Sequence, residues 1–221
     1  WMPNSAIIAA APILLVGLLL FEKNENQTGK LLTKTPLSAL FIIAACLQPH
    51  PNTKYAGSLL VGLGFCMGGD ILLISSQRRL FLLGLISFLL GHVAYTVAIV
   101  GVSQVNFWTG IGAVASIIVS SWIFMRLAPH LGPMKLPVLA YVGVITLMLC
   151  AVWSILGTVA VPAAGKFMVF FGALSFYISD IFVARQRFLT PAYLNRLIGL
   201  PLYYFGQFLL AFSTGIIPNI A

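Results

Sequence analysis

The sequence predicts an all-α membrane protein with eight transmembrane helices. Hydrophobic residues make up 60% of the 221 residues and charged residues only 7%, a composition that excludes an ordinary soluble domain. Apolar runs of about 20 residues recur along the chain, and each long run is sufficient to cross a hydrocarbon core of ~30 Å. The charged residues fall mainly between these runs. These three observations define the expected fold class.

The predicted spans follow one another with short loops between them. They cover residues 6–21, 36–47, 56–75, 80–101, 107–125, 136–157, 163–184 and 197–217. The second run is short, so its helix should begin in the Lys30–Lys34 region. No basic region precedes the first run, so we expect it to be a span and not a cleavable signal peptide.

Basic residues are distributed unevenly between the loops. Ten of the twelve lysines and arginines lie in or beside the first, third, fifth and seventh loops, and only Lys54 and Lys166 lie in the others. Loops rich in these residues stay on the cytoplasmic side of a membrane. We therefore expect both termini outside. The compact length and short loops suggest an integral protein of the bacterial inner membrane. The net charge of +8 then reflects orientation and contact with anionic lipid, and no nucleic-acid partner is expected.

An internal similarity divides the chain into halves of about 1–104 and 105–221. Three features recur in the same order: a K-x-P motif, an aspartate within a span, and a GL pair followed seven residues later by a second glycine. The K-x-P motif lies at 34–36 and again at 135–137, and the aspartate lies at 70 and again at 180. The glycine pattern lies at 84–92 and again at 199–207. Repeats with an even number of helices run parallel, and transporter-type repeats place a site at their interface. The sequence predicts one transmembrane domain of two parallel four-helix repeats.

Asp70 and Asp180 are the only acidic residues within the predicted spans. A carboxylate is costly to place in a membrane and by default marks a functional site. Asp70 lies eight residues before Arg78 and Asp180 five before Arg185, or ~12 Å and ~8 Å along a helix. Both should lie in the cytoplasmic half of the membrane, where packing could bring them together. A close pair would share a proton, one carboxyl acting as acid and the other as base.

Five further polar side chains are candidates for substrate binding. Lys34, at the entrance of the second span, could hold a phosphate or carboxylate, or could be an ordinary interfacial anchor. His92 and Tyr95 share a face of the fourth span. Tyr203 and Gln207, in the eighth span, could hydrogen-bond a headgroup or could join helices. His50 falls in an outer loop and His130 in an inner one, so the three histidines cannot meet. There is no His/Cys cluster either, so no metal or other cofactor is predicted.

These motifs resemble the YhhN-type membrane family, whose animal relatives are lysoplasmalogenases. The resemblance rests on Lys34, on GGDILL around Asp70, on GLxxFxxGHxxY ending at Tyr95, and on GAxxFxxSD ending at Asp180. Thr35 separates the lysine from the following proline, where many members have the two adjacent. The resemblance implies hydrolysis of the vinyl-ether bond of a lysoplasmalogen, which releases a fatty aldehyde and a glycerophospho-base.

The implied chemistry needs an acid, a carboxylate that stabilises a cation, and a base for water. The resemblance implies that Asp70 and Asp180 supply these roles, with their order left open. It also implies a lysophospholipid substrate, with its headgroup near Lys34 and the arginines and its chain between helices. Membrane lipid is the other expected partner, and the oligomeric state is left open.

Three other functions are compatible with two membrane aspartates. An intramembrane aspartyl protease uses such a pair, but its GxGD motif would need glycine in place of Met67, and no PAL motif follows Asp180. A proton-coupled transporter would use the aspartates as a relay, although no pair of broken helices is evident. A lipid-binding scaffold without catalysis is the third alternative.

Overall fold

The computed structural model describes residues 2–219, which form eight long α-helices and no strand. The long helices are α1 (Met2–Lys23), α2 (Gln27–Cys46), α3 (Thr53–Leu72), α4 (Arg78–Val100), α5 (Phe107–Leu127), α6 (Lys135–Gly157), α7 (Ala163–Ala184) and α8 (Tyr193–Ser213). The shorter turns are two 3₁₀ segments between α5 and α6, η1 (Ala128–His130) and η2 (Gly132–Met134), and a π-helical turn after α7, η3 (Arg185–Leu189). The expectation of an all-α fold is confirmed.

Asparagine caps define the first residues of three helices. The Asn26 side chain accepts a hydrogen bond from the backbone N–H of Gly29 at 2.9 Å, which satisfies one of the free donors at a helix start. α2 therefore begins at Gln27, earlier than the Lys30–Lys34 region that hydropathy predicted. Asn52 caps α3 and Asn106 caps α5 in the same way. Hydropathy misses these polar first turns because it detects only the apolar part of a helix.

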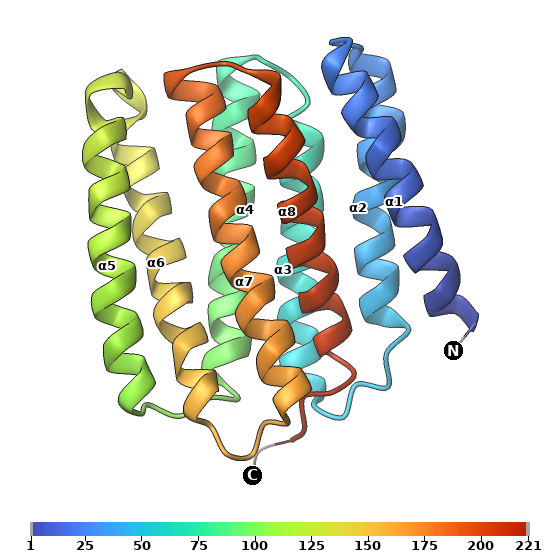
Figure 1. Ribbon diagram of the computed structural model, residues 1–221, viewed down its shortest axis with the longest axis vertical. Helices are drawn as coiled ribbons and strands as arrows, with labels where there is room; N and C mark the ends of the chain where they lie inside the picture. Colours follow the sequence, from blue (N-terminus) through green and yellow to red (C-terminus); the bar gives the residue numbers. More distant parts are fainter. Residues whose placement is uncertain (1, 220–221) are drawn as a thin grey trace.

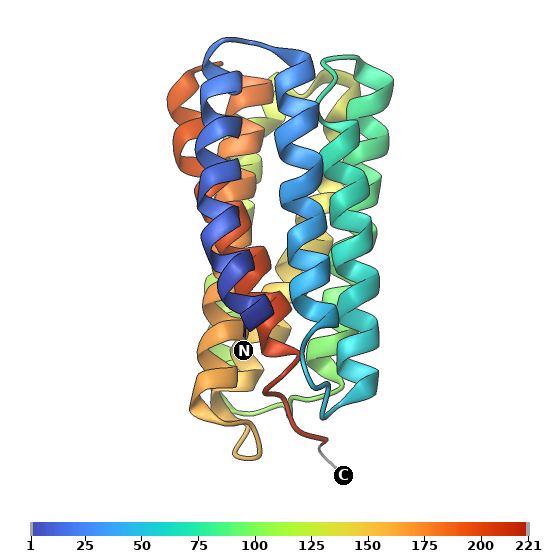
Figure 2. The ribbon, with the colours of Figure 1, turned by 90° about the vertical axis from the view of Figure 1, so that its right-hand side faces the viewer.

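The protein is an integral membrane protein, since seven of its helices are long and apolar enough to cross a membrane. The helix outside this set is α8, which carries Arg196, Tyr203, Tyr204 and Gln207 within its 21 residues. α8 nevertheless runs beside α7 within the bundle (Figures 1 and 2). The crossing of α8 and the orientation of the termini stay predictions.

The helices form a central group with a pair on either side. α3, α4, α7 and α8 occupy the centre, α1 and α2 stand on one side, and α5 and α6 stand on the other (Figure 1). Figure 2 views the bundle from the side of α1 and α2. Successive helices alternate in direction, so α3 and α7 run the same way and their aspartates approach the same end of the bundle.

Pairs of glycines let the central helices pack closely. A Cβ atom on Gly62 of α3 would lie 3.1 Å from the carbonyl oxygen of Gly91 of α4, and one on Gly206 of α8 would lie 2.6 Å from that of Gly172 of α7. Only glycine permits so close a backbone approach. Gly62 precedes Asp70 on α3 by eight residues, and Gly172 precedes Asp180 on α7 by the same number. This correspondence supports the predicted repeat, which stays a proposal.

Candidate active site

Both intramembrane aspartates line one pocket in the helix bundle. Its cavity volume is about 100 Å³, and every long helix except α1 contributes to its lining. Much of the wall is apolar, with Leu85, Phe88 and Ile123 among the lining side chains. Asp70 and Asp180 therefore face a largely hydrophobic space, in which electrostatic interactions are much stronger than in water.

Asp70 is buried and receives three polar contacts. The Lys34 Nζ atom lies 3.1 Å from Oδ1, and the hydroxyls of Ser38 and Tyr203 each donate to Oδ2 at 2.6 Å. Ser38 uses its one hydrogen on Asp70, so the hydroxyl of Tyr204, 3.2 Å away, donates to Ser38. Every contact to Asp70 comes from a donor, which is the environment of an ionised carboxylate.

Local helix geometry explains this arrangement. Lys34 and Ser38 are four residues apart on α2, so they lie one above the other on the same face. Both are buried, with 6% and 0% of their surfaces exposed. Lys34 therefore pairs with a carboxylate of the protein itself, and its binding of substrate stays a prediction.

Asp180 has a different environment. The Tyr141 hydroxyl of α6 donates to its Oδ2 atom at 2.5 Å, and the Nε2 atom of His92 lies 3.8 Å from the same oxygen. The Asp180 side chain is 20% exposed, compared with 2% for Asp70. No lysine or arginine among residues 2–219 forms an ion pair with it. The two carboxyls thus share a pocket but not a chemical environment.

The orientation of the His92 ring is fixed by the backbone. Its Nδ1 atom lies 2.6 Å from the carbonyl oxygen of Phe88, and a carbonyl can only accept, so Nδ1 carries the hydrogen. In the neutral ring Nε2 is then an acceptor. This atom is fully buried and has no hydrogen-bond partner within the described chain. The ring of Phe176 packs edge-on against the His92 ring, with 4.6 Å between the two ring centroids.

The remaining predicted residues separate into two groups. Tyr203 lines the pocket and contacts Asp70. Tyr95 instead donates to the Oε1 atom of Gln207 at 2.7 Å, and neither of these two residues is part of the pocket lining. This fully buried bond joins α4 to α8, which favours the helix-joining role over direct substrate contact.

Several polar side chains of the site were not predicted from the sequence. Ser38 and Tyr141 contact the aspartates directly, and Ser120 of α5 lies 2.9 Å from the hydroxyl of Tyr177 of α7 in the pocket wall. For Ser38 the available signal was its position one turn after Lys34. Ser120 and Tyr141 lie on apolar helices with nothing nearby in the sequence to single them out. Among the described residues, no group of three His, Cys, Asp or Glu side chains could hold a metal ion.

The fold and the site define a class: a polytopic helical membrane protein with two unlike carboxyl groups facing one apolar pocket. Residues 29–214 match the model of the YhhN family, so the chain belongs to this family. It is 31% identical over 182 residues to the Bos taurus protein lysoplasmalogenase TMEM86A. The aligned region covers 79% of this chain and 72% of the relative. The Homo sapiens protein of the same name is 30% identical over the same coverage. No solved structure matches the chain.

Proposed function

We propose that the protein is a lysoplasmalogenase-like hydrolase that cleaves the vinyl-ether bond of lysoplasmalogens. The products are a fatty aldehyde and a glycerophospho-base. Family membership and the two relatives named lysoplasmalogenase support a hydrolase of this kind, and they give no support to a protease or a transporter. The single observation that carries the proposal is that both membrane aspartates line one apolar pocket.

The reaction begins with proton transfer to carbon. The acid gives its proton to the β-carbon of the vinyl ether, and the electron pair of the double bond forms the new C–H bond. The α-carbon becomes an oxocarbenium ion, water adds to it with loss of a proton, and the resulting hemiacetal collapses to aldehyde and alcohol. One water is consumed. A positioned acid and a nearby negative charge are what the protein must supply.

The hydrogen-bond partners support a division of labour between the two aspartates. Asp70 accepts from Lys34, Ser38 and Tyr203, so it stays ionised and its negative charge stabilises the oxocarbenium ion. Asp180 accepts one hydrogen bond from Tyr141 and has no lysine or arginine partner among the described residues, and the imidazole beside it is neutral. It carries the proton, acts as the general acid, and takes a proton back from the attacking water. Each turnover thus returns Asp180 to its starting state.

His92 acts on this reaction by positioning. Its Nε2 atom lies 3.8 Å from the Oδ2 atom of Asp180, too far for a direct hydrogen bond but close enough for one water to contact both groups. A neutral imidazole with Nδ1–H fixed on the Phe88 carbonyl would hold that water in a defined orientation.

The test is product analysis with purified protein in detergent or lipid nanodiscs. Wild-type protein should release a fatty aldehyde from an alkenyl lysophospholipid and none from the matched ester lysophospholipid. Asp180→Asn should abolish aldehyde release because it removes the acid, and Asp70→Asn should lower kcat by at least a hundredfold because it removes the stabilising charge. Cys150→Ser is the matched control, since Cys150 lies on a membrane helix outside the pocket lining. Full activity in a folded Asp180→Asn variant would overturn the assignment.

A further inference from the structure

The pocket is short compared with the hydrocarbon chain of a membrane lipid. On each of α4, α5, α6 and α7 the first and last lining residues are seven positions apart, which is ~10 Å along a helix. These residues are Phe81 and Phe88, Ser120 and Leu127, Val138 and Ile145, and Tyr177 and Ala184. An extended chain that crosses half of a ~30 Å hydrocarbon core is ~15 Å long. Such a chain cannot lie entirely inside the pocket.

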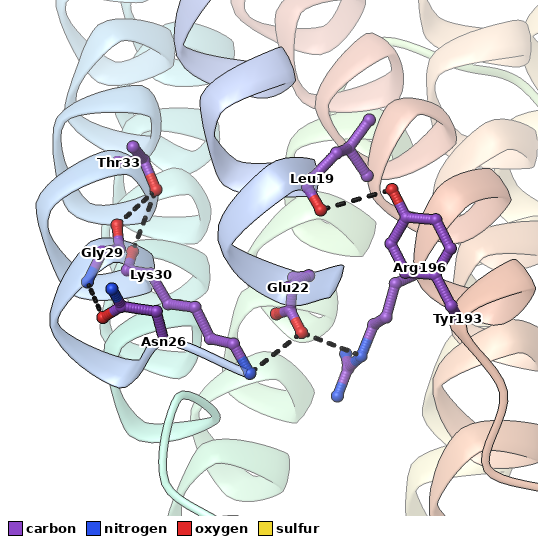
Figure 3. Close-up of polar contacts among 8 residues, drawn as sticks. All are labelled: Leu19, Glu22, Asn26, Gly29, Lys30, Thr33, Tyr193 and Arg196. Atoms are coloured by element: carbon purple, nitrogen blue, oxygen red, sulfur yellow. Dashed lines mark hydrogen bonds and ion pairs between the residues drawn. The ribbon is translucent and has the colours of Figure 1, made fainter. Parts of the chain in front are cut away.

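One end of the pocket is charged. Arg196 lies in the first turn of α8, at the end of the bundle that carries the loop between α3 and α4, and it lines the pocket. Its Nε atom forms an ion pair with Glu22 at 3.7 Å, and Lys30 pairs with the same carboxylate oxygen at 3.2 Å (Figure 3). An alkyl chain has no favourable partner among charged groups. The chain of a bound lipid therefore points away from this end, toward the middle of the bundle.

The opposite end of the pocket is closed by packed rings. Just beyond the lining residues Phe88 and Tyr177 lie His92 and Phe176, which are fully buried. The Phe176 ring packs edge-on against the rings of Phe88 and His92, with centroid distances of 6.1 Å and 4.6 Å. Tyr177 precedes Asp180 by three residues, or ~4.5 Å along α7. A chain whose reacting carbon lies beside Asp180 must therefore leave the pocket sideways, between two helices.

The wall between α5 and α7 differs from the other helix contacts of the bundle. Glycines close the contacts of α3 with α4, of α7 with α8, and of α5 with α6, where a Cβ atom on Gly112 would overlap the Trp153 ring. Between α5 and α7, at the closed end of the pocket, the hydroxyls of Ser120 and Tyr177 instead lie 2.9 Å apart. No other hydrogen bond or ion pair joins α5 to α7 within residues 2–219.

The surroundings of this hydroxyl pair suit a hydrocarbon chain. The pocket-lining residues of α4, α5 and α6 are apolar except for Ser120 and Tyr141, and Tyr141 donates to Asp180. Ile117 lies three residues before Ser120, on the same face of α5, and is 54% exposed. The face of α5 that carries Ser120 thus extends from the pocket to the hydrocarbon surface of the protein.

We propose that the alkyl chain of the substrate leaves the pocket between α5 and α7, and that the Ser120–Tyr177 hydrogen bond is a gate that a long chain must open. The inference rests on the proposed function for the presence of a single-chain lipid in the pocket. In the closed gate each hydroxyl satisfies the other within an apolar wall, where an unpaired hydroxyl is costly. The net contribution of one hydrogen bond between neutral groups is small, so the apolar contacts of a long chain outweigh its loss. Ser120 and Tyr177 are then specificity-determining residues for chain length.

The test compares two saturated ether lysophospholipids that differ only in having a butyl or a hexadecyl chain. They contain no vinyl ether, so their binding to purified protein in lipid nanodiscs is measured without turnover. Ser120→Ala and Tyr177→Phe should each tighten hexadecyl binding about threefold, because the chain no longer has to break a hydrogen bond. Butyl binding should not change, since this chain ends before the gate. The double variant should match the single variants, because each removes the same bond.

Tyr55→Phe is the matched control. Tyr55 of α3 and Ser213 of α8 form a buried hydroxyl pair of the same kind at 2.7 Å, and neither residue lines the pocket. This variant should leave both affinities unchanged. Should Tyr177→Phe fail to fold, Ser120→Ala decides. The proposal is overturned if the gate variants weaken hexadecyl binding or leave it unchanged, if they shift both lipids equally, or if Tyr55→Phe acts as they do.

The path of the chain is tested directly with a hexadecyl ether lysophospholipid that carries a diazirine at the end of its chain. After illumination, mass spectrometry should find the label on α5 or α7, and labelling of other helices without either of these would overturn the proposal. Neither measurement requires hydrolysis. Absence of aldehyde release would therefore overturn the proposed function alone, and aldehyde release without an effect of the gate variants would overturn this inference alone.

Discussion

At the scale of single residues, the site depends on a buried ion pair. The side chains of Lys34 and Asp70 are only 8% and 2% exposed, and removing two charges from water is costly unless further hydrogen bonds complete the site. Ser38 and Tyr203 provide these bonds to the second carboxylate oxygen. The pair is therefore stable only as a complete unit, which makes single substitutions more damaging than a paired one.

Lys34→Met should destabilise the protein by ~3–5 kcal/mol, because it leaves the Asp70 carboxylate buried without its cation. The double variant Lys34→Met/Asp70→Asn should recover most of this loss, since neither buried charge remains. Thermal unfolding in a fixed detergent measures both. A single variant as stable as wild type, or a double variant no better than the single one, would show that Asp70 is not held as an ion.

Tyr203→Phe should lower kcat for aldehyde release by roughly tenfold to a hundredfold, because a hydrogen bond to a charged group contributes ~1.5–3 kcal/mol. The adjacent Tyr204→Phe is the matched control. Tyr204 is equally buried, but it reaches Asp70 only through Ser38, so its loss should cost less. Equal losses from the two variants would contradict a direct role for the Tyr203 hydroxyl at Asp70.

At the scale of helices, glycine pairs bring the aspartates together. α3 packs on α4 and α7 on α8 through positions where a Cβ atom would meet a carbonyl oxygen. A backbone carbonyl cannot rotate away as a side chain can, so a methyl group at these positions must separate the helices. Because His92 directly follows Gly91 on α4 and Gln207 directly follows Gly206 on α8, these contacts also determine how the neighbouring polar side chains meet.

Gly206→Ala should destabilise the protein by ~1–3 kcal/mol through overpacking against the Gly172 carbonyl. Gly64→Ala, also within a membrane helix, should be neutral or stabilising by up to ~1 kcal/mol, because a Cβ there meets nothing within 4 Å and alanine favours a helix over glycine. Unfolding of the two variants side by side tests the comparison. A Gly206→Ala protein as stable as Gly64→Ala would contradict close packing of α7 on α8.

At the scale of the whole molecule, the alternating helix directions place the pocket near one end of the bundle. The loop between α3 and α4 lies at this end and the loop between α6 and α7 at the other (Figure 1). Most basic residues lie in loops at the same end as the loop between α3 and α4, and they predict that this end is cytoplasmic. If that prediction holds, the headgroup of a substrate must approach from the inner leaflet.

Single cysteines in a cysteine-free background test this orientation. Gln77→Cys, in the exposed loop between α3 and α4, should react with a membrane-impermeant maleimide only after right-side-out vesicles are opened. Val159→Cys, at a position 93% exposed between α6 and α7, should react in intact vesicles. The reverse labelling pattern would show that the protein has the opposite orientation and that the site lies in the outer leaflet.

The sequence by itself determined the membrane class, the eight helical segments, the family and the two aspartates as candidates. These properties depend on hydropathy, charge and motif spacing within short stretches of chain, which are readable locally. Only the tertiary structure decided that Lys34 and Ser38 hold Asp70, that Tyr141 and His92 face Asp180, and that Glu22 joins Arg196 beside the pocket. Each of these contacts joins different helices, so it depends on how the helices rotate and slide against one another. Close packing at glycines sets that geometry, and no local pattern in the sequence encodes it.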